Sequence, residues 1–327
     1  MVWRPAARSS VVDVRVLRAF AMSRMRSHAI MMWENTIASP AMIAGRGLHD
    51  GAPVRMTLKP ADPGTGIVFV RRDLGGDNRI AVRAEAVGAT NLGTVLENAD
   101  GASVSTVEHL MAALSGLSID NIVIELDNPE VPSVDGSSAP FVSLLQRAGL
   151  RRQGTPRRYI EVRKEIAVEQ DGKRAVLSPC DRFVVEVEIE FDTDAIGRQR
   201  VVFDSGKHQF ADMLASARTF GFLHEVEALH AAGRAQGASL ENSVVIDGDR
   251  IVNKDGLRYA DEFVRHKALD AIGDLYLAGA PILGRFSGFK TGHGMNNKVL
   301  RALLADKTAW RWRELAAENA TARDKAV

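Results

Sequence analysis

Hydrophobic and polar residues follow a regular pattern over most of the chain. Hydrophobic residues at every second position over 54–58 and an apolar run at 67–70 predict two strands, and the run 122–126 predicts a third. Hydrophobic residues three or four positions apart predict helices at 105–117 and from about 139 to 148. The first half is therefore expected to combine helices with a sheet.

The second half repeats this mixture after a polar stretch. Residues 151–156 are polar and contain glycine and proline, which predicts a linker. Strands are predicted at 160–168 and 183–191, and over 185–190 the valine and isoleucine side chains should face a core while the glutamates face solvent. The remaining predicted elements are, in chain order, a helical region near 209–217, an insert from about 221 to 253 and an amphipathic helix at 261–277.

Two of the predicted helices carry the same short pattern. Val107-Glu108-His109 is followed by Gly116, and Val264-Arg265-His266 is followed by Gly273, so that each glycine lies seven positions after its histidine. Each helix then leads to an apolar strand, a loop with glycine and another helix. The pattern predicts a duplicated unit of strands plus two helices.

Composition narrows the class of protein. The 327 residues are 46% hydrophobic and 25% charged, which is typical of a folded globular chain of one large or two ordinary domains. A formal net charge of +1 gives no overall field to attract nucleic acid or an anionic membrane. No run of 18 or more apolar residues predicts a membrane span. With Cys180 as the single cysteine, a metal site would have to be built from His, Asp and Glu.

The first 32 residues differ from the rest. They carry several arginines against one acidic residue, Asp13, a composition typical of a transit peptide. The alternatives are a disordered tail and a start assigned too far upstream, with Met25, Met31 or Met32 as the true start.

The helix predicted at 261–277 offers the first candidate chemistry. His266, Asp270 and Asp274 are spaced by four residues and therefore share one face of the helix. One interpretation is the solvated stripe of an amphipathic helix. The other is metal binding, because a histidine and an aspartate four apart can converge on one ion. That interpretation requires a third ligand elsewhere in the chain.

Glu108 and His109 are the candidates for a base and for this third ligand. In the structural interpretation, Ser105-x-x-Glu108 forms a capping box at the start of the helix. In the functional one, His109 binds zinc while Glu108 takes a proton from water whose pKa the metal lowers to about 7.

His293 stands between two glycines, Gly292 and Gly294, in a predicted loop before a helix. A loop histidine is ordinarily polar surface, but flanking glycines let the backbone pass close to a ligand. Asp274 could accept a hydrogen bond from the His293 ring and favour its protonated form, which would make His293 a general acid. The segment 218–222 reads either as part of this chemistry or as a helix C-terminus stopped by glycine.

Together these segments resemble the UDP-3-O-acyl-N-acetylglucosamine deacetylases of Gram-negative lipid A synthesis. The resemblance covers about residues 36–310 and rests on several motifs in fixed order. These motifs are residues 47–49, 103–110, 119–125, 135–141, 217–222, 261–267, 269–275 and the loop around His293.

The resemblance implies one zinc ion per chain held by His109, His266 and Asp270, with Fe²⁺ as the alternative metal. It implies Glu108 as general base and His293 as general acid. The other implied site residues are Asp274, which orients His293, Thr219, which helps to hold the oxyanion, and Lys267, Phe220, Lys173 and Phe191, which contact the substrate, the last two at its nucleotide.

The resemblance also implies an α+β fold of two similar domains, each layering helices against a β-sheet, with the active site between them. The insert at 221–253 is expected to form an apolar passage for the acyl chain. The expected boundaries are 1–32 for an N-terminal extension that is disordered or a mis-assigned start, 33–153 and 154–315 for the two domains, and 316–327 for a C-terminal tail.

The expected activity is zinc-dependent hydrolysis of the N-acetyl group of UDP-3-O-(3-hydroxyacyl)-N-acetylglucosamine, which releases acetate and commits the substrate to lipid A. We expect a cytoplasmic monomer that acts on this small molecule, without nucleic acid or stable membrane insertion. One rival is another zinc hydrolase such as a peptidase, although the chain lacks His-Glu-x-x-His. The second is a nucleotide-sugar or lipid-binding protein that has lost catalysis, against which the presence of Glu108 and His293 counts.

Overall fold

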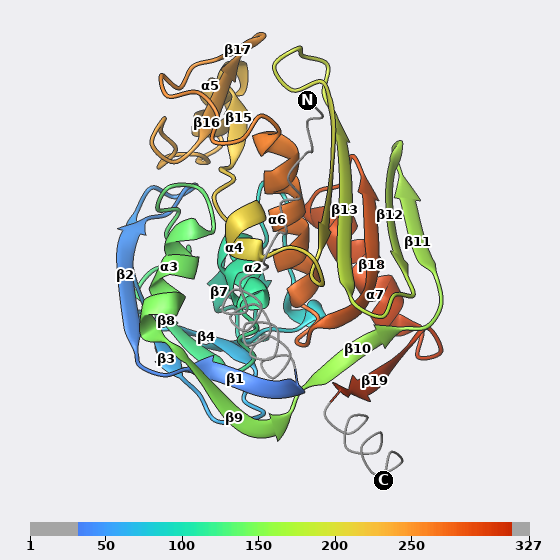
Figure 1. The fold of residues 1–327 in the computed structure, drawn as a ribbon. Coiled ribbons are helices and arrows are strands. Elements are labelled where there is room, and N and C mark those ends of the chain that lie inside the picture. The colour runs from blue at the N-terminus through green and yellow to red at the C-terminus, as the bar shows by residue number, and fades with distance from the viewer. Residues whose placement is uncertain (1–31, 316–327) are drawn as a thin grey trace, which may run out of the picture.

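The computed structural model describes residues 32–315. All but Met32 of the expected N-terminal extension, and the whole expected tail at 316–327, lie outside the described residues. The fold is α+β, as expected, with one main sheet in each half of the chain and helices packed between the two sheets (Figure 1).

The first half forms a five-stranded sheet in the order β2-β3-β8-β4-β5. Strands β4 and β8 run parallel and the other neighbours antiparallel. The strands predicted at 54–58, 67–70 and 122–126 are confirmed within this sheet. The strands are β2 (Ala41–Arg46), β3 (Pro53–Pro60), β4 (Ile67–Arg71), β5 (Arg79–Ala81) and β8 (Ile122–Leu126), and the helices of this half are α2 (Glu108–Gly116) and α3 (Ala139–Ala148).

The second half forms a seven-stranded sheet centred on β18 (Ile282–Phe289), which pairs with β12, β13 and β10. The alternation predicted in β13 is confirmed, since Val185, Val187 and Ile189 are buried and the glutamates between them are not. The other strands are β10 (Arg158–Val162), β11 (Ile166–Gln170), β12 (Lys173–Ser178), β13 (Phe183–Glu190), β14 (Arg198–Asp204) and β19 (Trp310–Glu314), and the helices are α6 (Glu262–Tyr276) and α7 (His293–Ala305).

Two predictions at the junction of the halves are wrong. The expected linker at 151–156 belongs to strand β9 (Leu150–Pro156), which pairs antiparallel with β1 (Trp33–Ile37). Its polar side chains mark exposure, and they do not prevent the backbone from pairing. The single strand expected at 160–168 is two strands, β10 and β11, which join different neighbours and are separated by the charged residues 163–165.

The insert forms a small separate layer beside the N-terminal end of α6, at the top of Figure 1. Its strands β15 (Phe220–Phe222) and β16 (Val244–Asp247) run parallel, and β17 (Arg250–Ile251) completes the three-stranded sheet. The helical region predicted near 209–217 is reduced to the four residues of α4 (Phe210–Met213). The remaining elements are η1 (Ala84–Ala86), β6 (Leu96–Glu97), β7 (Ser103–Val104), η2 (Leu223–Glu225) and α5 (Val226–Ala231).

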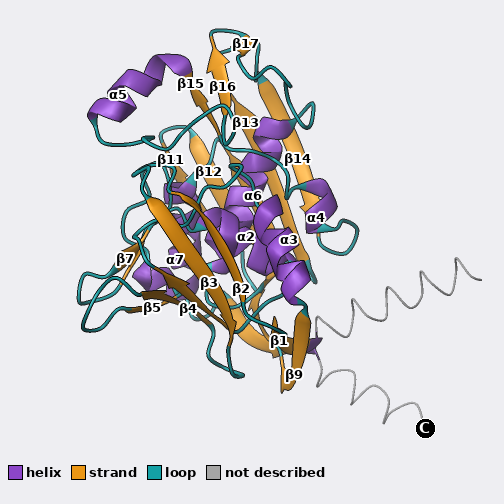
Figure 2. Ribbon diagram, turned by 90° about the vertical axis from the view of Figure 1, so that its left-hand side faces the viewer, coloured by secondary structure: helices purple, strands orange, loops and turns teal. Residues whose placement is uncertain are grey.

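Helices α2 and α6 lie against each other at the centre of the molecule (Figures 1 and 2). The two backbones approach closely at Gly273 of α6, where a Cβ atom would lie 2.0 Å from the backbone oxygen of Glu108 and 3.1 Å from the backbone nitrogen of Ala112. Gly116 of α2 likewise faces the ring of Phe210, with 2.4 Å between an added Cβ and the ring. The two glycines of the repeated sequence pattern therefore both allow close packing.

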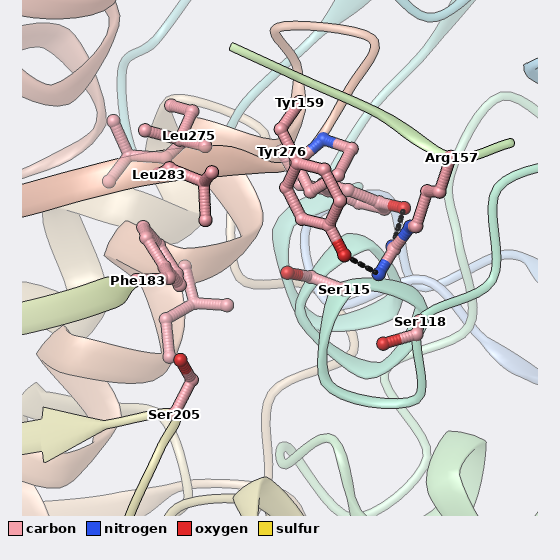
Figure 3. A pocket seen from close by; sticks show the side chains of 12 residues that line it. Ser115, Ser118, Arg157, Tyr159, Phe183, Ser205, Leu275, Tyr276 and Leu283 are labelled. Carbon is pink, nitrogen blue, oxygen red and sulfur yellow. Dashed lines mark hydrogen bonds between the residues drawn. The ribbon is translucent and has the colours of Figure 1, made fainter. Parts of the chain in front are cut away.

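The C-terminal end of α6 is held by a buried polar network beside a cavity of about 70 Å³ (Figure 3). Arg157 donates to Asp120 at 2.7 Å and to the hydroxyls of Tyr159 and Tyr276 at 3.3 Å. The Tyr276 hydroxyl donates to the backbone oxygen of Ile119 at 2.8 Å. This network joins the end of α6 to the loop that precedes β8 in the other half.

Among residues 32–315, no helix has the length and apolar character needed to cross a lipid bilayer.

Replacing Gly273 with alanine should destabilise the protein. An alanine in place of a helix-interior glycine usually stabilises by ~0.5–1 kcal/mol. Here the added carbon would force apart two backbones, and overpacking of this kind costs ~1–3 kcal/mol or more. Urea unfolding of Gly273→Ala measures the change. Gly75→Ala is the control, because no atom lies within 4 Å of a Cβ there; equal effects of the two substitutions would contradict the prediction.

Candidate active site

Helices α2 and α6 bring three of the predicted residues into one buried cluster. His109 comes from α2, and His266 and Asp270 come from α6. Their candidate ligand atoms all lie within 4.8 Å of one another. Oδ1 of Asp270 lies 3.5 Å from Nε2 of His109 and 3.4 Å from Nε2 of His266. His109 of the first domain is therefore the third candidate ligand, in addition to the two on α6.

Burial excludes the solvated stripe that was the alternative for α6. His266 and Asp270 are each 2% exposed and Asp274 is 1% exposed. Polar groups buried to this extent need partners or a ligand. This face of the helix is turned toward α2 and α7, so the amphipathic interpretation is wrong.

The cluster has the free donor atoms that a cation needs. Nδ1 of His266 faces the backbone oxygen of Ala217 at 3.0 Å, which leaves Nε2 toward the cluster. Burial lowers the pKa of His266 to about 3, so the ring is neutral and keeps a lone pair for a metal. Oδ1 of Asp270 is buried and accepts no hydrogen bond. Two imidazoles and one carboxylate form a set that could bind a metal ion.

Lys267 compensates the charge of this cluster. Its Nζ donates to Oδ2 of Asp270 at 2.7 Å, which leaves Oδ1 for a cation. Burial alone would raise the pKa of Asp270, but its neighbours His266 and Lys267 hold that pKa well below its usual value. Nζ of Lys267 also lies 5.7 Å from the ring centre of Phe220. The predicted substrate residues Lys267 and Phe220 thus lie together beside the cluster.

Glu108 points into the same site, and the capping box proposed as its alternative is wrong. Oε2 of Glu108 accepts the backbone N–H of Thr94 at 3.0 Å. The residue before α2 is Val107, which makes no side-chain cap, and the hydroxyl of Ser105 donates to the backbone oxygen of Pro129. The Glu108 carboxylate is 3% exposed and therefore sits within the dry interior.

His293 completes the group from the first turn of α7. Nδ1 of His293 lies 2.9 Å from Oδ2 of Asp274, and Nε2 lies 3.7 Å from Oε1 of Glu108. Burial alone would lower the pKa of His293, but the carboxylates of Asp274 and Glu108 outweigh it and raise this pKa to about 10. His293 is therefore protonated at neutral pH, and Nδ1–H donates to Asp274, as the sequence predicted.

A polar pocket of about 350 Å³ opens beside His293. Lys173 and Lys298 both line it, together with the glycines on either side of the histidine. Lys173, predicted to contact the nucleotide, thus lines the same pocket as His293. Its role stays a prediction.

Thr219 and Phe191 are neighbours of Phe220, Thr219 in sequence and Phe191 by ring packing. Thr219 precedes β15, and its N–H donates to the backbone oxygen of Gly136 at 2.8 Å. The segment is not a helix C-terminus, because β15 follows directly. Phe191 packs against Phe220 with ring centres 5.8 Å apart, and the Phe220 ring centre lies 6.3 Å from that of His266. Their roles stay predictions.

Sequence reasoning missed two residues that support this group. The Thr94 hydroxyl donates to Oδ1 of Asp274 at 2.7 Å, and Asn296 donates to Oδ2 of the same carboxylate at 2.9 Å. Asn296 could have been found, because it lies one helical turn after His293 and shares its face. Thr94 lies in an irregular segment with no periodic signal, and its contact spans 180 residues of sequence.

Metal-dependent hydrolases combine a set of metal ligands with groups that transfer protons. This site has the same combination: three buried candidate ligands, the Glu108 carboxylate beside them and the protonated His293 ring. Residues 34–305 match the family of UDP-3-O-acyl N-acetylglycosamine deacetylases, and the chain belongs to this family.

Similar proteins cover nearly the same region. A UDP-3-O-acyl-N-acetylglucosamine deacetylase of Phenylobacterium zucineum is 56% identical over 292 residues, which are 89% of this chain and 100% of that protein. A protein of the same name from Pseudoalteromonas atlantica is 48% identical over 86% of this chain and 93% of its own length. Another from Histophilus somni is 46% identical over 86% and 92%.

Asp270→Ala should abolish stoichiometric metal binding. Losing a partner that merely orients a ligand typically weakens binding ~10–100-fold, so losing a ligand should cost more than about 100-fold. Titration calorimetry of metal-free protein with Zn²⁺ measures the affinity. Asp261→Ala, at the residue just before the same helix, is the control, since Asp261 pairs with Arg265. Unchanged affinity in Asp270→Ala would mean that the metal binds elsewhere.

Proposed function

We propose that this protein is a zinc-dependent hydrolase that removes the N-acetyl group from UDP-3-O-(3-hydroxyacyl)-N-acetylglucosamine and releases acetate, the committed step of lipid A biosynthesis. The observation that carries the proposal is the cluster of His109, His266 and Asp270 between a buried carboxylate and a protonated histidine. Membership of the deacetylase family supports the substrate class.

His109, His266 and Asp270 would hold the zinc ion. Bound there, zinc supplies a Lewis acid that polarises the acetamide carbonyl and lowers the pKa of water. The neutral His266 ring, the unpartnered Oδ1 of Asp270 and the absence of cysteine from the cluster suit zinc or Fe²⁺.

Glu108 and His293 divide the proton transfers. Oε2 of Glu108 is engaged by the Thr94 N–H, so Oε1 takes the proton from the attacking water. Nε2 of His293 donates its proton to the amide nitrogen as the carbon–nitrogen bond breaks. The products are acetate and the free amine of the sugar. The 3.7 Å between Oε1 and Nε2 lets both groups reach one acetamide.

Thr219 and Lys267 would act on the substrate itself. Thr219 is held on both sides, because its N–H donates to Gly136 and its carbonyl accepts from Val244. Its hydroxyl is proposed to donate to the carbonyl oxygen as negative charge develops there. Lys267 and Phe220 are proposed to contact the sugar beside the cluster.

The pocket beside His293 would take the nucleotide. Lys173 and Lys298 give it positive charge, and the N-terminus of α7 points the positive end of a helix dipole toward it. A diphosphate suits this field. Phe191, near Phe220, is proposed to meet the nucleotide as well.

The insert would guide the acyl chain. Leu223 and Leu240 are 46% and 48% exposed, so both present apolar side chains on this small layer. Phe222 lies next to Leu223 and packs on Phe191 with 6.0 Å between ring centres. This apolar surface is proposed as the passage for the chain. We further propose that the enzyme is cytoplasmic and acts as a monomer. Its net charge of +1 offers no overall field toward membranes or nucleic acid.

Acetate release from 3-O-acylated UDP-N-acetylglucosamine tests the proposal. Activity should disappear on chelation and return with about one equivalent of zinc, as one three-ligand site requires. Glu108→Gln should lose orders of magnitude in kcat and keep its zinc. A folded, zinc-loaded protein that releases no acetate would overturn the deacetylase function. Release of amino acids from peptides instead would favour the peptidase rival.

The pH profile should report His293. As general acid it must be protonated, and its pKa of about 10 predicts that kcat/KM falls only as pH rises through about 10. Asp274→Asn removes a carboxylate that raises this pKa, while burial continues to lower it. The alkaline limb should therefore move to lower pH. An alkaline limb at the same pH in Asp274→Asn would exclude His293 as its source.

A further inference from the structure

One threonine contacts both halves of the proton-transfer apparatus. Thr94 lies in the irregular segment before β6 and is 1% exposed. Its backbone N–H donates to Oε2 of Glu108 at 3.0 Å, and its hydroxyl donates to Oδ1 of Asp274 at 2.7 Å. Thr94 and Glu108 belong to the first domain and Asp274 to the second, so the bond to Asp274 crosses between the domains at the site.

The Thr94 hydroxyl fixes which oxygen of Asp274 is available to His293. With Oδ1 taken by Thr94, Oδ2 accepts Nδ1–H of His293 and the side-chain amide of Asn296, both at 2.9 Å. A carboxylate with donors on both oxygens has one orientation, which fixes the plane of the His293 ring. Nε2 of that ring then lies 3.7 Å from Oε1 of Glu108.

The backbone N–H decides which oxygen of Glu108 is free. It binds Oε2 and leaves Oε1 toward His293. The preceding residue is Gly93, where a Cβ would lie 3.3 Å from Oε1. The absence of a side chain at this position leaves room beside the free oxygen.

We propose that Thr94 is a positioning residue of the reaction, which holds the base Glu108 and the carboxylate Asp274 in register across the two domains. The inference rests on the proposed deacetylase function and adds to it a residue outside the predicted site. Thr94 would act through the two carboxylates that its N–H and its hydroxyl bind.

Thr94→Val tests the hydroxyl alone, because valine has the same shape and keeps the backbone N–H. We expect kcat for acetate release to fall ~10–100-fold, the range typical when a group that orients a functional side chain is lost. KM should stay within about twofold, since ground-state binding is not touched. Thr94→Ser restores the hydroxyl and should recover most of kcat. Zinc content should be one per chain in all three proteins.

A double-mutant cycle separates positioning from simple destabilisation. If the hydroxyl acts through Asp274, Thr94→Val should cost little more in the Asp274→Asn background, because groups that act as a unit are not additive. Thr36→Val is the control, since Thr36 is fully buried in the same domain and its hydroxyl accepts the N–H of Ala61 at 3.1 Å. This control should keep kcat unchanged whatever it does to the unfolding temperature.

Several results would overturn the inference. They are wild-type kcat in Thr94→Val, no recovery in Thr94→Ser, losses that multiply in full with Asp274→Asn, or an equal loss of kcat in Thr36→Val. Each leaves the deacetylase function standing, because the wild-type protein still releases acetate. A zinc-loaded wild-type protein without acetate release overturns the function and this inference together.

Discussion

The site depends on the backbone contact between α2 and α6. At Gly273 the two helices are so close that a single added carbon would lie 2.0 Å from the backbone oxygen of Glu108. His109 follows that oxygen by one residue, and Asp270 and Asp274 flank the glycine on its own helix. Side chains of ordinary length can therefore reach one another across the contact. A wider helix spacing of 8–10 Å with side chains between would hold the two half-sites apart.

Charge balance makes this dry arrangement tolerable. Three carboxylates, Glu108, Asp270 and Asp274, are nearly fully buried, and uncompensated burial of one such charge costs several kcal/mol. Lys267 and the protonated His293 supply two positive charges, and the proposed cation supplies the rest. The residues spaced by four along α6 have different roles. His266 and Asp270 belong to the metal cluster, and Asp274 holds the proposed general acid, His293. The metal cluster and the acid–base pair are thus one electrostatic unit.

Local pattern predicted the elements well and their partners poorly. The strand at 122–126 and the helix at 139–148 follow directly from hydrophobic spacing and are confirmed. The linker at 151–156 was wrong because polar composition reports exposure, while pairing with β1 depends on a segment more than 100 residues away. Glu108 fits a capping box in the local sequence, but in the folded chain its carboxylate accepts the backbone N–H of Thr94. The candidate ligands could be predicted from the spacing on α6 and from the family resemblance. Neither the spacing nor the resemblance indicated the contacts of Thr94.

Neither domain contains a complete site. The first supplies His109, Glu108 and Thr94. The second supplies the candidate ligands His266 and Asp270, together with Asp274 and His293. The interface between the domains is therefore the functional unit, and the Arg157 network matters although it lies at the C-terminal end of α6, beyond Asp274. By tying Tyr276 to Ile119 it prevents α6 from sliding along α2, and a shift of about 1 Å is enough to spoil catalytic geometry. Stability of this interface and activity should then change together, even for residues that touch no substrate.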